Sequence, residues 1–418
     1  MTSTLSQLLR TTALTIAWLM VAPCLVLLLS AIVPVIPWLR IYASSVVPNH
    51  TSWFFLWANA ALIVGLLANS LQRTRIAISL AATSAITVLV TAAVMLNLLY
   101  VAESNGAQID LVRALSLREL DEGAAPDESR VYARPQGEAL TLDIYHPRNT
   151  RPDTLSPVML IVHGGGFIEG SRAFGAANLR WYADRGWTVI SIDYRLARPG
   201  RPTWNLATRD VQCALAWTAA NAGSLGIDIN RLTLGGSSAG GTLAMAAAYS
   251  TDASPPDPSC GPRLPRVTAV VVKVPLIDVA GSWHEGGELG NLQRTYLTSY
   301  LGGSPEQYPD RYAAADLSRA VRPGNPPTLI LGGASDPIVA PQGAIEFTRR
   351  AKAAGLEVRH ILFPYSGHDF NTSFDGITNQ ALLQIIAQFA SDHDGGQMAS
   401  RNAETPRVAS GLSRARGS

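Results

Sequence analysis

The sequence contains Gly236-Ser237-Ser238-Ala239-Gly240 and, upstream of it, His163-Gly164-Gly165-Gly166-Phe167. The first segment fits G-x-S-x-G, a sharp turn between a strand and a helix that holds a serine hydroxyl over the edge of a sheet. A strand-like run at 231–234 precedes it, and a helix-forming run of small residues follows it. Such a strained turn needs small residues two positions before and after the serine, and both are glycine here. We therefore predict that the turn presents Ser238 as a nucleophile. The alternative is a buried serine at a glycine-rich helix start.

The glycine-rich segment 163–167 follows an apolar run at 157–162, which has the length of a buried strand. In a loop of this kind the backbone N–H groups face the serine and can bind a negatively charged oxygen. We expect His163 to support this loop rather than to transfer protons.

Apolar runs alternate with helical patterns along much of the chain, which indicates a parallel sheet covered on both faces. A turn signal at 135–137 predicts an antiparallel hairpin ahead of these strands. We therefore predict an α/β domain over about 128–392. Its expected strands are 130–133, 138–145, 157–162, 187–195, 231–234, 269–274, 327–331 and 358–363, and its expected helices are 176–186, 205–224, 239–250, 341–354 and 376–391.

An acid and a base follow the serine, each in a loop directly after a predicted strand. These are Asp336 and His368. Because ligands in open α/β sheets gather at the carboxyl ends of the strands, both loops should face the same edge as Ser238. Of the seven histidines we expect His368 to act as the base. We favour Asp336 over Asp193 as the acid beside it, and we expect Asp193 to be structural.

Together these motifs resemble the hormone-sensitive-lipase-like serine esterases of the α/β-hydrolase superfamily. The similarity runs from about 138 to 390 and rests on His-Gly-Gly-Gly-Phe, Asp-Tyr-Arg, Gly-Ser-Ser-Ala-Gly-Gly, an Asp-Pro after Gly-Gly, and Gly-His-Asp-Phe. The resemblance implies a carboxylic ester hydrolase, an esterase or lipase, that needs no cofactor. It also implies that Ser238 is the nucleophile, that His368 is the base and that Asp336 orients this histidine.

The resemblance further implies an oxyanion hole made of the N–H groups of Gly165, Gly166 and Ala239. The chain departs from the family at Ser237, where many members carry an acidic residue. The segment 279–325 holds more apolar and aromatic residues than a plain loop needs. Insertions at this edge commonly line the pocket, so we predict a lid or side wall here. The alternative is a helix packed only on the core.

We expect two aromatic side chains, Phe167 and Trp283, to contact the substrate. The substrate class is a small-molecule or lipid-like ester. Two alternative functions remain, an amidase or aminopeptidase-type hydrolase and a non-catalytic binding module on the same fold. A serine triad by itself does not distinguish esters from amides. A silent module would have lost a catalytic residue, and this chain retains all three.

The first 101 residues are of a different kind, because three runs there carry no charged residue: 11–39, 52–71 and 76–101. Each exceeds the ~18 residues that a membrane-spanning helix requires. Positive charge stays on the cytoplasmic side, and Arg10, Arg73 and Arg75 flank these runs on one side. We therefore predict an integral membrane protein whose catalytic domain is extracytoplasmic.

The rest of the chain gives fewer signals. We expect a polar linker at 102–127 and a disordered tail at 393–418. With a net charge of +2 and no run of basic residues, nothing indicates nucleic-acid binding. The three cysteines have no metal-ligand spacing, so we predict no metal site. A disulfide between Cys213 and Cys260 is conceivable, but the sequence decides neither this pairing nor the oligomeric state.

Overall fold

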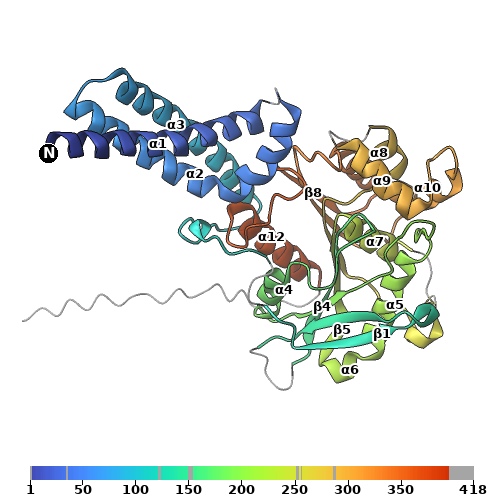
Figure 1. Ribbon diagram of the computed structural model, residues 1–418. Helices are drawn as coiled ribbons and strands as arrows, with labels where there is room; N and C mark the ends of the chain where they lie inside the picture. The colour runs from blue at the N-terminus through green and yellow to red at the C-terminus, as the bar shows by residue number, and fades with distance from the viewer. Residues whose placement is uncertain are drawn as a thin grey trace, which may run out of the picture.

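The computed structural model describes residues 2–33, 36–120, 124–148, 154–250, 254–255, 257–285 and 289–394. It consists of a bundle of three long helices and an α/β domain that meets one end of the bundle (Figure 1). The predicted disordered tail lies outside the described residues from 395 onward.

The α/β domain is built on one eight-stranded sheet with the order β1-β2-β4-β3-β5-β6-β7-β8. The pairs β1–β2 and β2–β4 are antiparallel, and all other neighbours are parallel. The α/β-hydrolase fold class predicted from the sequence, with its leading hairpin, is therefore confirmed. The strands are β1 (Glu128–Ala133), β2 (Leu140–Tyr145), β3 (Ser156–Val162), β4 (Thr188–Ile192), β5 (Ile227–Ser237), β6 (Ala269–Lys273), β7 (Thr328–Gly333) and β8 (Val358–Phe363).

Helices cover both faces of this sheet, which explains why its central strands are apolar throughout. In β3, for example, Leu160 packs in the cluster that contains α5, α7 and α11, whereas Met159 packs in the cluster of α4 and α12. Successive side chains of a strand point to opposite faces, so both must be apolar. The helices of the domain are α4 (Ala176–Ala183), α5 (Ala207–Ala220), α6 (Ala222–Leu225), α7 (Ala239–Ala248), α8 (Val279–Glu285), α9 (Gly290–Leu301), α10 (Pro309–Ala315), α11 (Gln342–Ala353) and α12 (Ile377–His393).

Four short 3₁₀ helices complete the described elements: η1 (Arg113–Leu115), η2 (Pro135–Gly137), η3 (Pro258–Cys260) and η4 (Leu317–Ala320). The element η2 forms the turn between β1 and β2, where the sequence predicts a hairpin turn.

The bundle contains three helices that are long and apolar enough to cross a membrane: α1 (Thr2–Ile32), α2 (Pro37–Leu71) and α3 (Arg75–Ser104). The prediction of three such helices is confirmed, but the boundary of the first differs. The charge-free run 11–39 is divided, because α1 ends at Ile32 and α2 begins at Pro37. Proline fits the first turn of a helix, where its missing N–H group has no intrahelical partner to lose.

The helix α2 also begins well before the predicted span 52–71. Ser44 and Asn49 in its first part form hydrogen bonds with the α/β domain. The helix is bent at His50, whose φ is −128° and ψ is 18°. Tertiary packing thus supports helix in a stretch whose hydropathy alone does not predict a span.

The segment predicted as a linker lies against α12 over its described first part. The side chains of Gln380 and Gln384 each exchange two hydrogen bonds with its backbone, at Asp110 and Gln108 respectively. Farther on, Arg113 forms an ion pair with Asp375 at 2.8 Å. The segment after the bundle is therefore attached to the domain at two places, by the hydrogen bonds to α12 and by the ion pair of Arg113.

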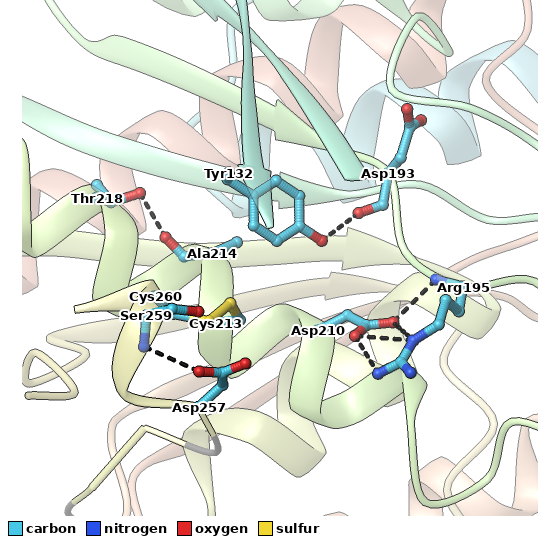
Figure 2. The surroundings of a disulfide bond; sticks show 10 residues. All are labelled: Tyr132, Asp193, Arg195, Asp210, Cys213, Ala214, Thr218, Asp257, Ser259 and Cys260. Atoms are coloured by element: carbon cyan, nitrogen blue, oxygen red, sulfur yellow. Dashed lines mark hydrogen bonds and ion pairs between the residues drawn. A yellow bond between two sulfur atoms is a disulfide. The ribbon is translucent and has the colours of Figure 1, made fainter. Parts of the chain in front are cut away.

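The pairing of cysteines that the sequence leaves open is present in the structure. A disulfide joins Cys213 in α5 to Cys260 in η3, across a sequence separation of 47 residues (Figure 2). One turn earlier in α5, Asp210 accepts hydrogen bonds from the Arg195 guanidinium. In the chain-entropy model a cross-link over this separation stabilises the fold by about 4 kcal/mol.

Candidate active site

The turn at Ser238 has the strained geometry that its sequence predicts. The strand β5 ends at Ser237 and α7 begins at Ala239, so Ser238 forms the turn between them. Its φ of 53° and ψ of −124° lie where residues other than glycine are rare. A Cβ atom on Gly236 would collide with the carbonyl oxygen of Gly240, which explains why this position needs glycine.

His368 and Asp336 meet Ser238 at the carboxyl edge of the sheet. Nε2 of His368 lies 3.0 Å from Oγ of Ser238, and Nδ1 lies 2.7 Å from Oδ2 of Asp336. The second oxygen of Asp336 accepts the N–H groups of Ile338 and Val339, each at 2.9 Å. These bonds fix the position of the carboxylate. Asp336 and the two N–H groups lie in the loop after β7, and His368 lies in the loop after β8. Among the described residues, His368 is the one histidine whose ring contacts Ser238.

The glycine-rich loop lies beside this serine, as its position after β3 requires. A Cβ atom on Gly164 would stand 3.4 Å from Cβ of Ser238, which shows how close the two turns are. The loop closes on itself through the carbonyl of Gly165, which accepts the N–H groups of Ile168 and Glu169 at 3.0 Å. The backbone N–H groups of Gly165, Gly166 and Ala239 donate no hydrogen bond to another described residue. These groups are therefore available to a negatively charged oxygen.

The histidine at the start of this loop is located as the sequence predicts. The ring of His163 stacks on Tyr194 with 4.5 Å between ring centroids, and its Nδ1 lies 2.7 Å from the Gly164 carbonyl oxygen. Burial lowers the pKa of His163, which favours the neutral form of the ring. Burial likewise lowers the pKa of His360 in β8 to about 4.

Asp193, the acid that we did not favour as the partner of His368, binds an arginine instead. Asp193 binds Arg172 with 2.6 Å between Nη1 and Oδ2, and its other oxygen accepts the backbone N–H of the same arginine at 2.9 Å. A second ion pair involves Arg172 and Asp143, at 2.9 Å. This network ties the loop after β4 to the loop after β3.

The described residues of the segment 279–325 include α8, α9, α10 and η4, and α9 contacts the glycine-rich loop. A Cβ atom on Gly166 would touch the ring of Tyr296. The ring of Phe167 stacks on Tyr300 at 3.9 Å and is 2% exposed, so it packs between the loop and α9. Trp283 lies in α8 with its ring edge-on to Tyr312, 6.0 Å away. The sequence singles out Trp283, whereas the structure places Tyr296 against the glycine-rich loop, a position that no sequence motif marks.

We expect Tyr296→Ala to widen the space above the glycine-rich loop and to raise kcat/KM for long acyl chains over acetyl esters by about tenfold. The measurement is a series of aryl esters of increasing acyl length. Trp283→Ala serves as the comparison and should shift the preference less. A larger shift for Trp283→Ala would favour the expectation drawn from the sequence alone.

Ser237 lies on the other face of the sheet from α7, where it lines a cavity of about 110 Å³. The same cavity is lined by Lys273 and Asn371, and Nζ of Lys273 donates a hydrogen bond to Oδ1 of Asn371 at 2.6 Å. Burial lowers the pKa of this lysine. No group of His, Cys, Asp and Glu that could hold a metal ion is found within the ranges that the structure describes.

The loop that carries His368 also touches α2, which the sequence does not indicate. Asn49 hydrogen-bonds the backbone of this loop and is 3% exposed. In the sequence, the only sign of this contact is a polar residue next to an apolar span, and this sign does not identify the segment that the residue contacts.

Comparisons with known proteins agree with this arrangement. The esterase LipC of Mycobacterium tuberculosis is 30% identical over 261 residues, which cover 60% of this chain and 62% of LipC. The ethyl acetate hydrolase of Pseudomonas putida is 30% identical over 244 residues, 56% of this chain and 72% of that protein. The chain thus spans less than two thirds of LipC, and the same holds for the related esterase LipQ.

Among solved structures, a thermophilic esterase of Thermogutta terrifontis, Est2, with propionate bound, superposes with a TM-score of 0.53 and 24% identity. The match covers 65% of this chain and 95% of Est2, and at this identity it shows the fold. The BD-FAE family model matches residues 142–350, half of the chain. The resemblance to α/β-hydrolase esterases is thereby confirmed, and this chain belongs to the BD-FAE family.

Proposed function

We propose that this protein is a membrane-anchored serine carboxylesterase that works through an acyl-enzyme intermediate. The observation that carries the proposal is the chain of contacts from Ser238 Oγ through the His368 ring to Asp336, at 3.0 and 2.7 Å. A serine hydroxyl is a poor nucleophile until a base within hydrogen-bond reach takes its proton. A carboxylate on the far nitrogen fixes the tautomer of that base and stabilises the imidazolium that forms.

In the first half of this reaction, Oγ of Ser238 bonds to the acyl carbon and its proton passes to Nε2 of His368. The alcohol then leaves with that proton, and the acyl group stays on the serine. In the second half, a water molecule bonds to the acyl carbon and gives one proton to His368. The bond between the acyl carbon and Oγ then breaks, Oγ takes the proton back from His368, and the carboxylic acid is released. The N–H groups of Gly165, Gly166 and Ala239 would stabilise the oxyanion, at roughly 3–4 kcal/mol for each such donor. Because α7 begins at Ala239, directly after Ser238, the positive end of this helix would also stabilise the oxyanion.

For the substrate we propose small carboxylic esters, because the Pseudomonas putida relative is an ethyl acetate hydrolase. Steady-state turnover of matched aryl esters and anilides tests the reaction class. The proposal expects ester turnover that exceeds anilide turnover by orders of magnitude. Preferential anilide cleavage would assign the chain to the amidase-type alternative, and no turnover of either series would favour a binding module.

We further propose that the α/β domain lies outside the cytoplasm. Three basic residues support this orientation, because they gather at the end of the bundle away from that domain. The Arg10 guanidinium donates to the carbonyl oxygens of Ala68 and Gln72, next to Arg73 and Arg75. Positive charge marks the cytoplasmic end of spans.

The disulfide between Cys213 and Cys260 supports the same orientation, because disulfides persist in oxidising compartments and are rare in the cytosol (Figure 2). The exposed aromatic rings of Trp38, Tyr42 and Tyr100 lie toward the domain end of the bundle, as an aromatic belt would.

We expect a reporter that is active only after export, such as alkaline phosphatase, to be active when it is fused to the C-terminus. The same reporter fused in the loop at 72–74 should be inactive, because that loop is cytoplasmic in this orientation. Activity of the loop fusion alone would reverse the orientation and leave the chemistry untouched.

A further inference from the structure

We propose that the first part of α2, residues 37–49, positions the catalytic histidine, so that the membrane bundle completes the active site. We call this part the α2 arm. The proposal rests on the proposed function and adds to it a dependence of catalysis on a helix of the membrane region. The α2 arm lies at the end of the bundle that meets α12 (Figure 1).

The α2 arm holds the backbone on both sides of His368. Before the histidine, the N–H of Gly367 donates to the carbonyl oxygen of Ser44 at 2.8 Å. After it, the side-chain amide of Asn49 donates to the carbonyl oxygen of Asp369 at 2.9 Å. The amide oxygen of Asn49 also accepts the N–H of Ser373 at 3.1 Å. The histidine thus lies between two backbone groups that are both hydrogen-bonded to the α2 arm.

A proline in α2 explains why the backbone carbonyl of Ser44 can accept a hydrogen bond from outside its own helix. In a regular helix the carbonyl of residue 44 would bond the N–H of residue 48. Residue 48 is Pro48, which has no N–H group, and proline inside a helix leaves the carbonyl four residues earlier without its partner. The carbonyl of Ser44 takes the N–H of Gly367 instead. The bend of the helix follows at His50, where the arm passes into the remainder of α2.

The contact is close and fully buried. Ser44 and Val47 are 0% exposed. A Cβ atom on Gly367 would collide with Oγ of Ser44, so the loop approaches the helix as closely as glycine permits. Buried polar groups are costly unless they are hydrogen-bonded, and Asn49 satisfies its amide on this loop and on the Ser45 carbonyl.

A third contact comes from α3, on the same loop. Nδ2 of Asn97 donates to Oη of Tyr365 at 2.9 Å. Tyr365 has a φ of 59°, which bends the chain just before the histidine, and it packs against the hydrophobic cluster that contains Val47 and Ile377. The loop is therefore fastened to two helices of the bundle.

These contacts matter because proton transfer depends on the position of the histidine ring. Its Nε2 must stay within about 3 Å of Oγ of Ser238, and a displacement of 1 Å can cost about a hundredfold in rate. The hydrogen bonds that Ser44 and Asn49 make outside their own helix reach the loop of His368, and none of them reaches the glycine-rich loop or α9. A loosened arm should thus lower kcat and leave KM nearly unchanged. A residue that only stabilised the fold would not produce this split.

The experiment compares Asn49→Ala with Asn59→Ala in the full-length protein. Asn59 is a matched control, because it lies in the same helix and donates to the carbonyl oxygen of Phe55 in its own helix. We expect Asn49→Ala to lower kcat for a soluble aryl acetate by about ten- to a hundredfold with KM within twofold. The rate at which a fluorophosphonate labels Ser238 should fall by the same factor. Asn59→Ala should match the wild type in all three quantities.

A second pair of variants keeps the test decisive if Asn49→Ala fails to fold. Pro48→Ala restores a backbone N–H group that competes with Gly367 for the Ser44 carbonyl. Alanine also has a higher helix propensity than proline, so we expect the substitution to stabilise the helix itself. Its control is Pro23→Ala, in the interior of α1. We expect Pro48→Ala to lower kcat several-fold and Pro23→Ala to leave it unchanged.

Equal kcat values for Asn49→Ala and Asn59→Ala in folded protein would overturn the proposal, as would an unchanged kcat for Pro48→Ala. Wild-type protein that hydrolyses no ester would overturn the proposed function instead, so the two failures are distinguishable.

Discussion

Ser238→Ala should abolish ester hydrolysis and leave the fold intact. We expect kcat to fall by roughly 10⁴- to 10⁶-fold, because the substitution removes the atom that forms the acyl-enzyme. The remaining rate would come from the oxyanion donors and from substrate binding alone. Thermal unfolding of the variant should resemble that of the wild type, since Oγ contributes little packing. The measurements are steady-state hydrolysis of an aryl acetate and covalent labelling by a fluorophosphonate.

Ser237→Ala is the matched control, because it removes the same atom one residue away. Its side chain lines the cavity on the opposite face of the sheet, beside Lys273. We expect its kcat to stay within about threefold of the wild type. If Ser237→Ala were inactive and Ser238→Ala active, the turn between β5 and α7 would present the wrong serine for our mechanism.

Asp336→Asn should lower kcat by roughly 10³- to 10⁴-fold with little change in KM. The amide has nearly the same shape as the carboxylate and can still accept the N–H groups of Ile338 and Val339. Toward His368 it can present an N–H group, which forces the proton onto the nitrogen that must accept from the serine. It also removes the negative charge that stabilises the imidazolium.

Asp193→Asn is the control for this second prediction. Asp193 binds Arg172 and makes no hydrogen bond to His368 among the described residues, so we expect kcat within about tenfold of the wild type. A loss for Asp193→Asn as large as that for Asp336→Asn would contradict our choice of acid. Steady-state kinetics at saturating ester, with a thermal unfolding midpoint for each variant, separates loss of catalysis from loss of fold.

The proposed attachment of His368 to α2 changes how the two halves of the molecule are regarded. A membrane anchor joined by a flexible linker would only raise the concentration of enzyme near the bilayer. Here Gln108 and Asp110 are bonded to α12, and Asn49 is bonded to the histidine loop. On our proposal, any change in the position of α2 reaches the catalytic base directly.

The sequence alone determined the features that local patterns encode. The length of the apolar runs and their alternation with helical patterns predict the parallel sheet and the three apolar helices, because burial on both faces requires apolar residues throughout. The positions of Ser238, Asp336 and His368 were predictable for a similar reason. Each follows a strand of one parallel sheet, and all such strands end at the same edge.

Only the tertiary structure decided which residues from distant parts of the chain come together. The pairing of Cys213 with Cys260, the place of Tyr296 against Gly166 and the bonds of Asn49 to the histidine loop join segments from 47 to about 320 residues apart. Such contacts leave no periodicity in either segment. Pro48 shows the limit most clearly: only the structure shows that residues 37–49 are helical, so that proline leaves the Ser44 carbonyl without its helical partner, and only the folded chain brings Gly367 to it.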